Sequence, residues 1–73
     1  MRVISLKYGK DINYDNFSIT IEENENHVDV RAFSDYNSNR AIIGSFNSSK
    51  EAETLVKNIA LAYEKGKTVY FID

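Results

Sequence analysis

The chain has 73 residues, a net charge of −2 and 42% hydrophobic residues, which together are typical of one small soluble globular domain. Folding at this length buries only about 60% of the surface that the open chain exposes, so an isolated copy is marginally stable. The absence of cysteine excludes disulfides, thiolate zinc sites and cysteine nucleophiles, and the single histidine excludes a cluster of imidazole ligands. Because no disulfide or metal site of these kinds supplements the core, we expect the chain to self-associate, in the simplest case as a homodimer.

Residues 1–8 contain too short and too interrupted an apolar run for a signal peptide, and no later stretch approaches the roughly 20 apolar residues that span a bilayer. We therefore expect a cytoplasmic protein without a membrane partner. Eight asparagines, eight isoleucines and no proline are typical of an AT-rich genome, such as that of a low-GC bacterium or its phage. A phage or mobile-element accessory protein fits this composition.

Alternating apolar residues predict four successive β-strands. Three of them place a set of side chains on one face: Ile4, Leu6 and Tyr8 in residues 3–8; Phe17, Ile19 and Ile21 in residues 17–22; Val28, Val30 and Ala32 in residues 27–33. The fourth, residues 40–46, is ambiguous because apolar side chains point to both faces. The connections, residues 9–16, 23–26 and 34–39, are rich in Asn, Asp and Ser, which favour turns. Links this short predict an antiparallel meander.

The most regular pattern predicts a helix over residues 48–65. Ser48 and Glu51 match a capping box, in which the Ser48 hydroxyl accepts from the Glu51 amide and the Glu51 carboxylate accepts from the Ser48 amide. Gly66 can adopt the left-handed backbone conformation that commonly ends a helix. The apolar residues between these two ends recur at helical spacing: Ala52, Leu55, Val56, Ile59, Ala60 and Tyr63. A last strand over residues 67–72 is apolar on both faces, which indicates an internal position or a covered edge.

The element order β-β-β-β-α-β predicts a single α+β domain over residues 1–73, with a four-stranded antiparallel meander, one helix and a C-terminal strand. If the helix runs back across the sheet, the last strand can lie antiparallel to the first, which gives the strand order 5-1-2-3-4. One helix hardly covers five strands. The uncovered part of the sheet is therefore where we expect a partner to bind.

Acidic residues are concentrated in one part of the chain. Residues 11–35 carry seven acids against Arg31 alone, a net charge of −6, whereas the other segments sum to +4. Such segregation favours a docking surface for a basic protein partner, which we assign to the hairpin acids Glu22, Glu23 and Glu25. The more ordinary interpretation of the same residues is a solvated turn.

Asp11, Asn13 and Asp15, followed by Glu22, match the spacing of a calcium loop in which Asn16 replaces the usual glycine. A calcium loop needs a helix on each side, whereas residues 17–22 alternate as a strand and carry Glu22 about 20 Å from the turn. We therefore interpret the motif as a turn built from Asx hydrogen bonds and expect no metal site.

His27 and Asp29 lie on one face of a predicted strand and resemble a base with its orienting carboxylate. Catalysis would also need a nucleophile and an oxyanion site, and only Ser18 or Thr20 on the neighbouring strand is available. No glycine-rich phosphate loop or nucleophile elbow is present. We expect no enzymatic activity and no cofactor.

An alternative function uses the outward sheet face, where Lys7, Arg31, Phe33 and Arg40 resemble a surface that stacks a base or holds a small ligand. A sequence pI near 5.3 and the neighbouring acids oppose the approach of phosphates, which makes nucleic acid an improbable partner. Cross-strand ion pairing explains these residues more simply.

Leu61 lies on the polar side of the predicted helix, nine residues after Ala52 and therefore opposite the buried stripe. Our candidates for self-association are Leu61, Tyr63 of the same helix and the last strand, in which we name Tyr70. The sequence thus favours a small non-catalytic protein-interaction module that self-associates and binds a basic partner through its acidic hairpin.

Overall fold

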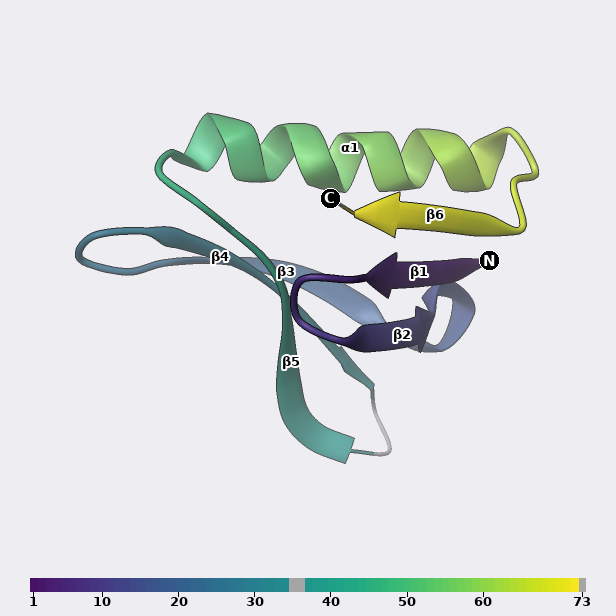
Figure 1. The fold of residues 1–73 in the computed structure, drawn as a ribbon, viewed down its shortest axis with the longest axis horizontal. Coiled ribbons are helices and arrows are strands. Elements are labelled where there is room, and N and C mark those ends of the chain that lie inside the picture. The colour runs from purple at the N-terminus through teal and green to yellow at the C-terminus, as the bar shows by residue number, and fades with distance from the viewer. Residues whose placement is uncertain (35–36, 73) are drawn as a thin grey trace.

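The structure is a computed structural model that describes residues 1–34 and 37–72, with side chains described for residues 1–34 and 40–72. This part of the chain forms two three-stranded sheets and one helix, α1 (Ser49–Glu64), so the predicted α+β class is confirmed (Figure 1). The first sheet has the order β2 (Lys10–Asn13), β1 (Arg2–Ser5), β6 (Val69–Ile72). The second has the order β3 (Ser18–Glu23), β4 (Val28–Ser34), β5 (Asn37–Phe46).

The second sheet is an antiparallel meander of the last three of the four strands that were predicted to form it. Its registers pair Ile21 with Val30 between β3 and β4, and Val30 with Gly44 between β4 and β5. The alternation of β4 directs Val28, Val30 and Ala32 into the core, where they are 7%, 0% and 0% exposed, as predicted. β5 begins at Asn37, earlier than the predicted residue 40, and residues 35–36 of the predicted 34–39 connection lie outside the described residues.

The first sheet corrects the prediction for the N-terminal strand. β1 ends at Ser5, so Leu6 and Tyr8 belong to a turn, and Leu6 is 67% exposed rather than buried. Val3 and Ser5 face the core instead of Ile4. The predicted turn over residues 9–16 also contains β2, which the sequence pattern missed.

The single sheet with strand order 5-1-2-3-4 is wrong. β1 pairs with β2 in an antiparallel register and with β6 in a parallel one, and it does not pair with β3. The reason is local: Gly9, at φ 63°, helps to reverse the chain after β1, so β2 takes the neighbouring position that β3 was expected to fill. A 3-10 helix, Tyr14–Asn16, then leads into the second sheet, and α1 returns the chain so that β6 enters beside β1 in the same direction.

Both ends of α1 follow from the sequence. The Ser48 hydroxyl accepts a hydrogen bond of 3.3 Å from the Glu51 amide, the first half of the predicted capping box. At the other end Gly66 has φ 77°, while the amides of Gly66 and Lys67 donate to the carbonyls of Tyr63 and Ala62 at 3.0 and 3.1 Å. This is the Schellman arrangement that ends many helices.

The core joins both sheets to the helix. Ala52, Leu55 and Ile59 are the buried side chains of α1, whereas Ala60 and Tyr63, which belong to the same apolar helical pattern, are exposed. The buried hydrophobic side chains of the two sheets are Val3, Ile12 and Ile72 in the first, and Val28, Val30, Ala32 and Ile43 in the second. Among the described residues no helix combines the length and apolar character needed to cross a membrane.

Candidate interaction surfaces

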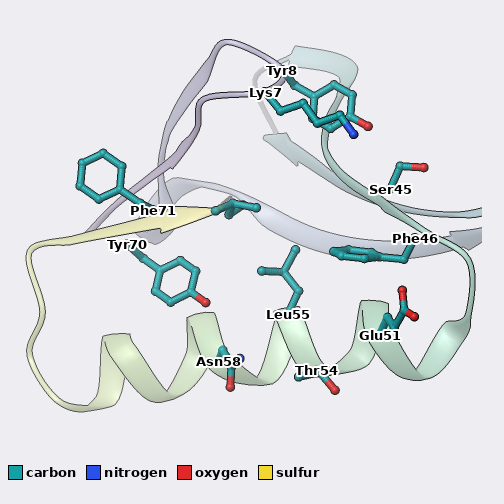
Figure 2. A pocket seen from close by; sticks show the side chains of 11 residues that line it. Lys7, Tyr8, Ser45, Phe46, Glu51, Thr54, Leu55, Asn58, Tyr70 and Phe71 are labelled. Carbon is teal, nitrogen blue, oxygen red and sulfur yellow. The ribbon is translucent and has the colours of Figure 1, made fainter.

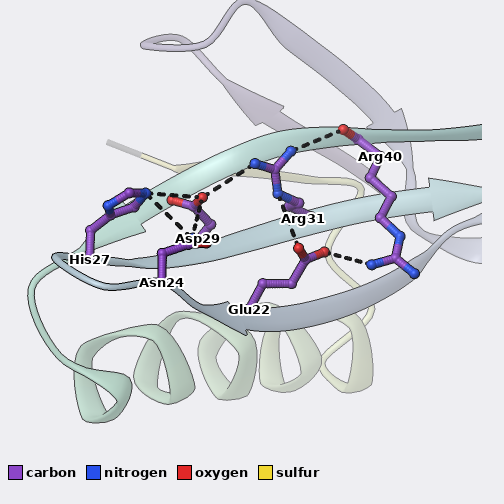
Figure 3. A network of polar contacts seen from close by, with 6 residues as sticks. All are labelled: Glu22, Asn24, His27, Asp29, Arg31 and Arg40. Carbon is purple, nitrogen blue, oxygen red and sulfur yellow. Dashed lines mark hydrogen bonds and ion pairs between the residues drawn. The ribbon is translucent and has the colours of Figure 1, made fainter.

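The acidic hairpin is already engaged within the molecule (Figure 3). Glu22 Oε2 lies 2.9 Å from Arg40 Nη1, and Glu22 Oε1 lies 3.6 Å from Arg31 Nε. Glu23 accepts a hydrogen bond from the Ser49 hydroxyl, which ties the hairpin to the start of α1. Glu25 is exposed in the turn between β3 and β4. The three acids therefore do not form one uncompensated negative patch.

Behind Glu22 lies a buried carboxylate. Asp29 is 1% exposed, and its Oδ2 accepts from Asn24 Nδ2 at 3.1 Å and from Arg31 Nη2 at 3.3 Å. His27 Nε2 is 3.4 Å from the same oxygen, so the predicted His27 and Asp29 pair does meet. The other oxygen, Oδ1, is buried without a hydrogen-bond partner.

The pair does not extend towards a nucleophile. Among the described residues no hydrogen bond joins His27 to the hydroxyl of Ser18 or Thr20, and Thr20 Oγ1 is buried without a hydrogen-bond partner. Ser18 lies opposite Phe33, four residues along β4 from Asp29. The described neighbours of Asp29 are thus groups that balance its charge.

Three of the four residues of the alternative ligand face come together. The guanidinium carbon of Arg40 lies 5.4 Å from the centre of the Phe33 ring, and Arg31 Nη1 donates to the Arg40 carbonyl at 3.4 Å. Lys7 lies elsewhere, with its Nζ 5.6 Å from the centre of the Tyr8 ring. Because both arginines face the carboxylates of Glu22 and Asp29, this face does not present an uncompensated cationic surface to a phosphate.

The acids of the calcium-like motif have separate partners. The Asn13 side chain accepts from the Asp15 amide at 3.1 Å, which confirms the Asx turn. Asp11 pairs with Arg2 at 2.6 Å, and this hydrogen bond lowers the pKa of Asp11. Among the described residues no three His, Asp or Glu side chains gather as a metal site would require.

Tyr63, one of the predicted self-association residues, is part of the packing of its own chain. Its ring centre lies 5.0 Å from that of Tyr14. Its hydroxyl donates to Asp15, which lowers the pKa of Asp15 and raises that of Tyr63. Tyr63 therefore joins the last turn of α1 to the 3-10 helix, although 47% of it is exposed.

Leu61 and Tyr70, the other two predicted residues, line a groove between α1 and β6. The groove consists of two adjoining cavities of about 340 and 480 Å³, and both are lined by Asn58, Tyr70 and Phe71. Figure 2 shows the first cavity, with the Tyr70 ring directed towards the helix and Phe71 directed away from it. Leu61 lines the second cavity and is 40% exposed.

The groove follows the unpaired edge of β6. Among residues 1–34 and 37–72, β6 pairs with β1 alone and therefore ends the first sheet. The Arg2 amide donates to the Thr68 carbonyl at 2.9 Å, so the backbone groups of Thr68 and Tyr70 point to β1. Those of the alternate residues, Val69 and Phe71, point to the free edge. Of the two positions that the sequence indicated for this strand, an internal position or a covered edge, the internal one is wrong.

We call this region the β6 surface: the free edge of β6 with Val69, Tyr70 and Phe71, and the groove side of α1 with Asn58 and Leu61. Phe71 was not singled out in the sequence, although it is 56% exposed. The signal that could have found it is the run Val69–Ile72, which is too apolar for a strand with a solvent face.

Comparisons of the chain with protein-family models, with curated proteins and with solved structures found no match.

Proposed function

We propose that the chain is a small non-catalytic protein-interaction module that self-associates through the β6 surface. The observation that carries the proposal is an unpaired strand edge whose four residues, Val69–Ile72, are all apolar or aromatic. Proteins usually protect such an edge with lysine, proline, a bulge or a covering segment, because it pairs readily with another strand. The described part of β6 has no proline, lysine or bulge.

The side chains beside the edge support the same proposal. Leu61 and Phe71 are 40% and 56% exposed, and they flank the groove from the helix and from the strand. Burying them against a partner removes apolar surface from water, which stabilises the assembly. A domain this small gains more from such an interface than a large domain does.

A basic protein partner at the acidic hairpin has less support. Glu22 already faces two arginines and Glu23 accepts from Ser49, so among the described residues Glu25 is the one predicted acid without a hydrogen bond or ion pair. A small ligand is a second candidate, because a cavity of about 340 Å³ with aromatic walls falls within the usual size of ligand sites. Such a ligand would fill one part of the groove and leave the edge of β6 unpaired.

The proposal is tested with Leu61→Glu and the matched variant Ala60→Glu. Both positions are exposed on α1, but only Leu61 lines the groove, so both variants are expected to fold. Light scattering of the parent chain at micromolar concentration should give at least twice 8.4 kDa. Ala60→Glu should keep this mass, and Leu61→Glu should shift the protein to the monomer. A parent chain that stays monomeric over a hundredfold concentration range would contradict the proposal.

A further inference from the structure

We propose that the first cavity, of about 340 Å³, is a binding site for a neutral nucleoside whose base carries an exocyclic amine, such as adenosine. Four segments that are far apart in the sequence converge on this cavity: the turn after β1, the end of β5, α1 and β6 (Figure 2). A cavity of this size with apolar walls and a few polar groups is the usual form of a small-molecule site. The site goes beyond self-association, because Leu61 lines only the second cavity.

The charges on the cavity wall favour a neutral ligand. Among the described residues that line it, Glu51 is the one acid and Lys7 is the one base, so the two charges balance. Figure 2 shows Glu51 on α1, whereas Lys7 lies with Tyr8 on the side away from the helix. A cation or a phosphate would be attracted by one of these two groups and repelled by the other.

The apolar part of the cavity suits a flat ring. Leu55 points into it from α1, between Phe46 and Tyr70 (Figure 2). The Phe46 and Tyr70 side chains are only half-buried, so part of each ring is available to a ligand. Nucleobases stack on aromatic side chains in this way, whatever their sequence context.

The polar group at one end of the cavity selects an amine. The Glu51 carboxylate has no hydrogen bond or ion pair with a described residue. An ionised carboxylate only accepts hydrogen bonds, so its partner on the ligand must be a donor. Because the charges of the lining balance, a neutral amine suits this position better than an ammonium group. Carboxylates accept in the same way from the exocyclic amine of a base.

The other end of the cavity offers neutral polar groups. Asn58 lies seven residues after Glu51, which is about two turns and about 10.5 Å along the same side of α1. Its amide both donates and accepts, as does the hydroxyl of Tyr70, and neither has a hydrogen-bond partner among the described residues. Sugar hydroxyls also donate and accept. A nucleoside thus places its amine at Glu51, its ring over Leu55 and its sugar at Asn58.

Calorimetric titration of the full chain with adenosine tests the site. Inosine carries a carbonyl in place of the amine, so it leaves the Glu51 carboxylate without a donor. Adenosine should therefore bind about tenfold more tightly than inosine. AMP should bind no more tightly than adenosine, because the lining offers no net positive charge to its phosphate.

Glu51→Gln tests the contact with the amine. The glutamine side chain keeps an acceptor and adds a donor, which can pair with the carbonyl of inosine. The preference for adenosine should therefore disappear in this variant. Glu53→Gln is the matched control, because Glu53 is an exposed acid of α1 outside the cavity lining, and it should keep the preference of the parent chain.

Asn58→Ala tests the orientation of the ligand. Alanine is a good helix former, so this exposed position of α1 should tolerate it. The variant should bind adenosine about fivefold more weakly and should bind the free base adenine as the parent chain does, because adenine has no sugar to contact Asn58. Equal losses for adenosine and adenine would overturn the proposed orientation.

The other outcomes are equally distinct. No adenosine binding at millimolar concentration would overturn the site, and so would equal affinities for adenosine and inosine or a much tighter binding of AMP. Leu61→Glu should bind adenosine as tightly as the parent chain, and a loss of binding there would place the ligand outside the first cavity. A parent chain that binds adenosine as a monomer would contradict the proposed function and leave the site standing. A dimer that binds no adenosine would do the reverse.

Discussion

Asp29 and Arg31 lie two residues apart on β4, and their side chains meet at 3.3 Å although the Asp29 side chain is only 2% exposed. Alternation places both on the sheet face opposite the core-facing valines, so this carboxylate is buried by its polar neighbours and not by the core. Removing one partner of a buried ion pair leaves a charge without compensation, which generally costs more than the pair itself contributes.

The first prediction follows from this burial. Asp29→Ala should lower the free energy of unfolding by about 2 kcal/mol, less than for a wholly buried pair because the Arg31 side chain is 30% exposed. Asp29→Asn should cost less, since an amide oxygen still accepts from Asn24. Urea unfolding of the two variants measures the difference. Equal losses in both would show that the charge, and not the hydrogen bonds, determines the effect.

The second prediction concerns Glu22, which bridges Arg31 and Arg40. Glu22→Gln should destabilise the fold by about 0.5–1 kcal/mol at low salt, a modest value because all three side chains are partly exposed. Screening should reduce the loss at high salt. Glu25→Gln is the matched control, because this acid is exposed in the turn, and it should leave stability unchanged. A loss for Glu22→Gln that is independent of salt would contradict the ion-pair explanation.

The third prediction concerns the pH dependence of the contact between Asp15 and Tyr63. The hydrogen bond from the Tyr63 hydroxyl is the main cause of the lowered pKa of Asp15, and the same bond raises the pKa of Tyr63. Its stabilisation is present above the usual aspartate pKa and below the usual tyrosine pKa. It is lost as the pH falls through the lowered pKa of Asp15, and again as the pH rises through the raised pKa of Tyr63.

Tyr63→Phe tests this linkage while keeping the ring against Tyr14. An NMR titration of the Asp15 carboxyl should show a higher pKa in the variant than in the parent chain. The N-terminal ammonium, 3.4 Å from Asp15 Oδ2, should keep part of the shift. An unchanged Asp15 pKa would mean that the hydroxyl does not bond to this carboxylate in solution.

The elements that sequence predicted well are those with a local cause. The hydroxyl of Ser48 and the glycine at position 66 determine the ends of α1, and the alternation of β4 determines which of its residues enter the core. Each of these signals acts over a few residues. They needed no knowledge of the neighbouring strands.

The first sheet was not predictable in this way because its strands are only four residues long. β2 contains a single apolar residue, Ile12, whose partner Val3 lies in another strand, so no periodicity reveals it. The parallel pairing of β1 with β6 joins the two ends of the chain. It depends on where the end of α1 places the following segment relative to β1, which is a tertiary property.

The candidate site shows the same division. Leu61 was found because an apolar residue on the polar side of a helix is visible in the helical spacing. Phe71 was included only as part of the last strand, because a strand that is apolar on both sides does not reveal which of its side chains is exposed. The uncompensated negative charge of the acidic hairpin was overestimated because Glu22 pairs with Arg40, eighteen residues away.

The last prediction concerns the close approach of β5 to α1 at Gly44. A Cβ atom at this position would lie 3.1 Å from Leu55 Cδ2 and 3.1 Å from Phe46 Cε2, closer than ordinary van der Waals contact. Gly44→Ala should therefore destabilise the fold by about 1–3 kcal/mol, the usual cost of adding a methyl group to a packed core. Gly9→Ala adds the same atom where nothing lies within 4 Å, so its cost comes only from the positive φ of 63°.

A double-mutant cycle identifies the cause of the Gly44→Ala effect. Leu55→Ala alone should cost about 2–3 kcal/mol through the cavity that it leaves. In the Gly44→Ala background the loss should be smaller by about 1 kcal/mol, since the shortened side chain removes the clash with the new methyl group. Chemical unfolding of the four proteins gives the coupling energy. Strictly additive losses would show that β5 and α1 move apart to admit the methyl group, so that Leu55 does not limit their approach.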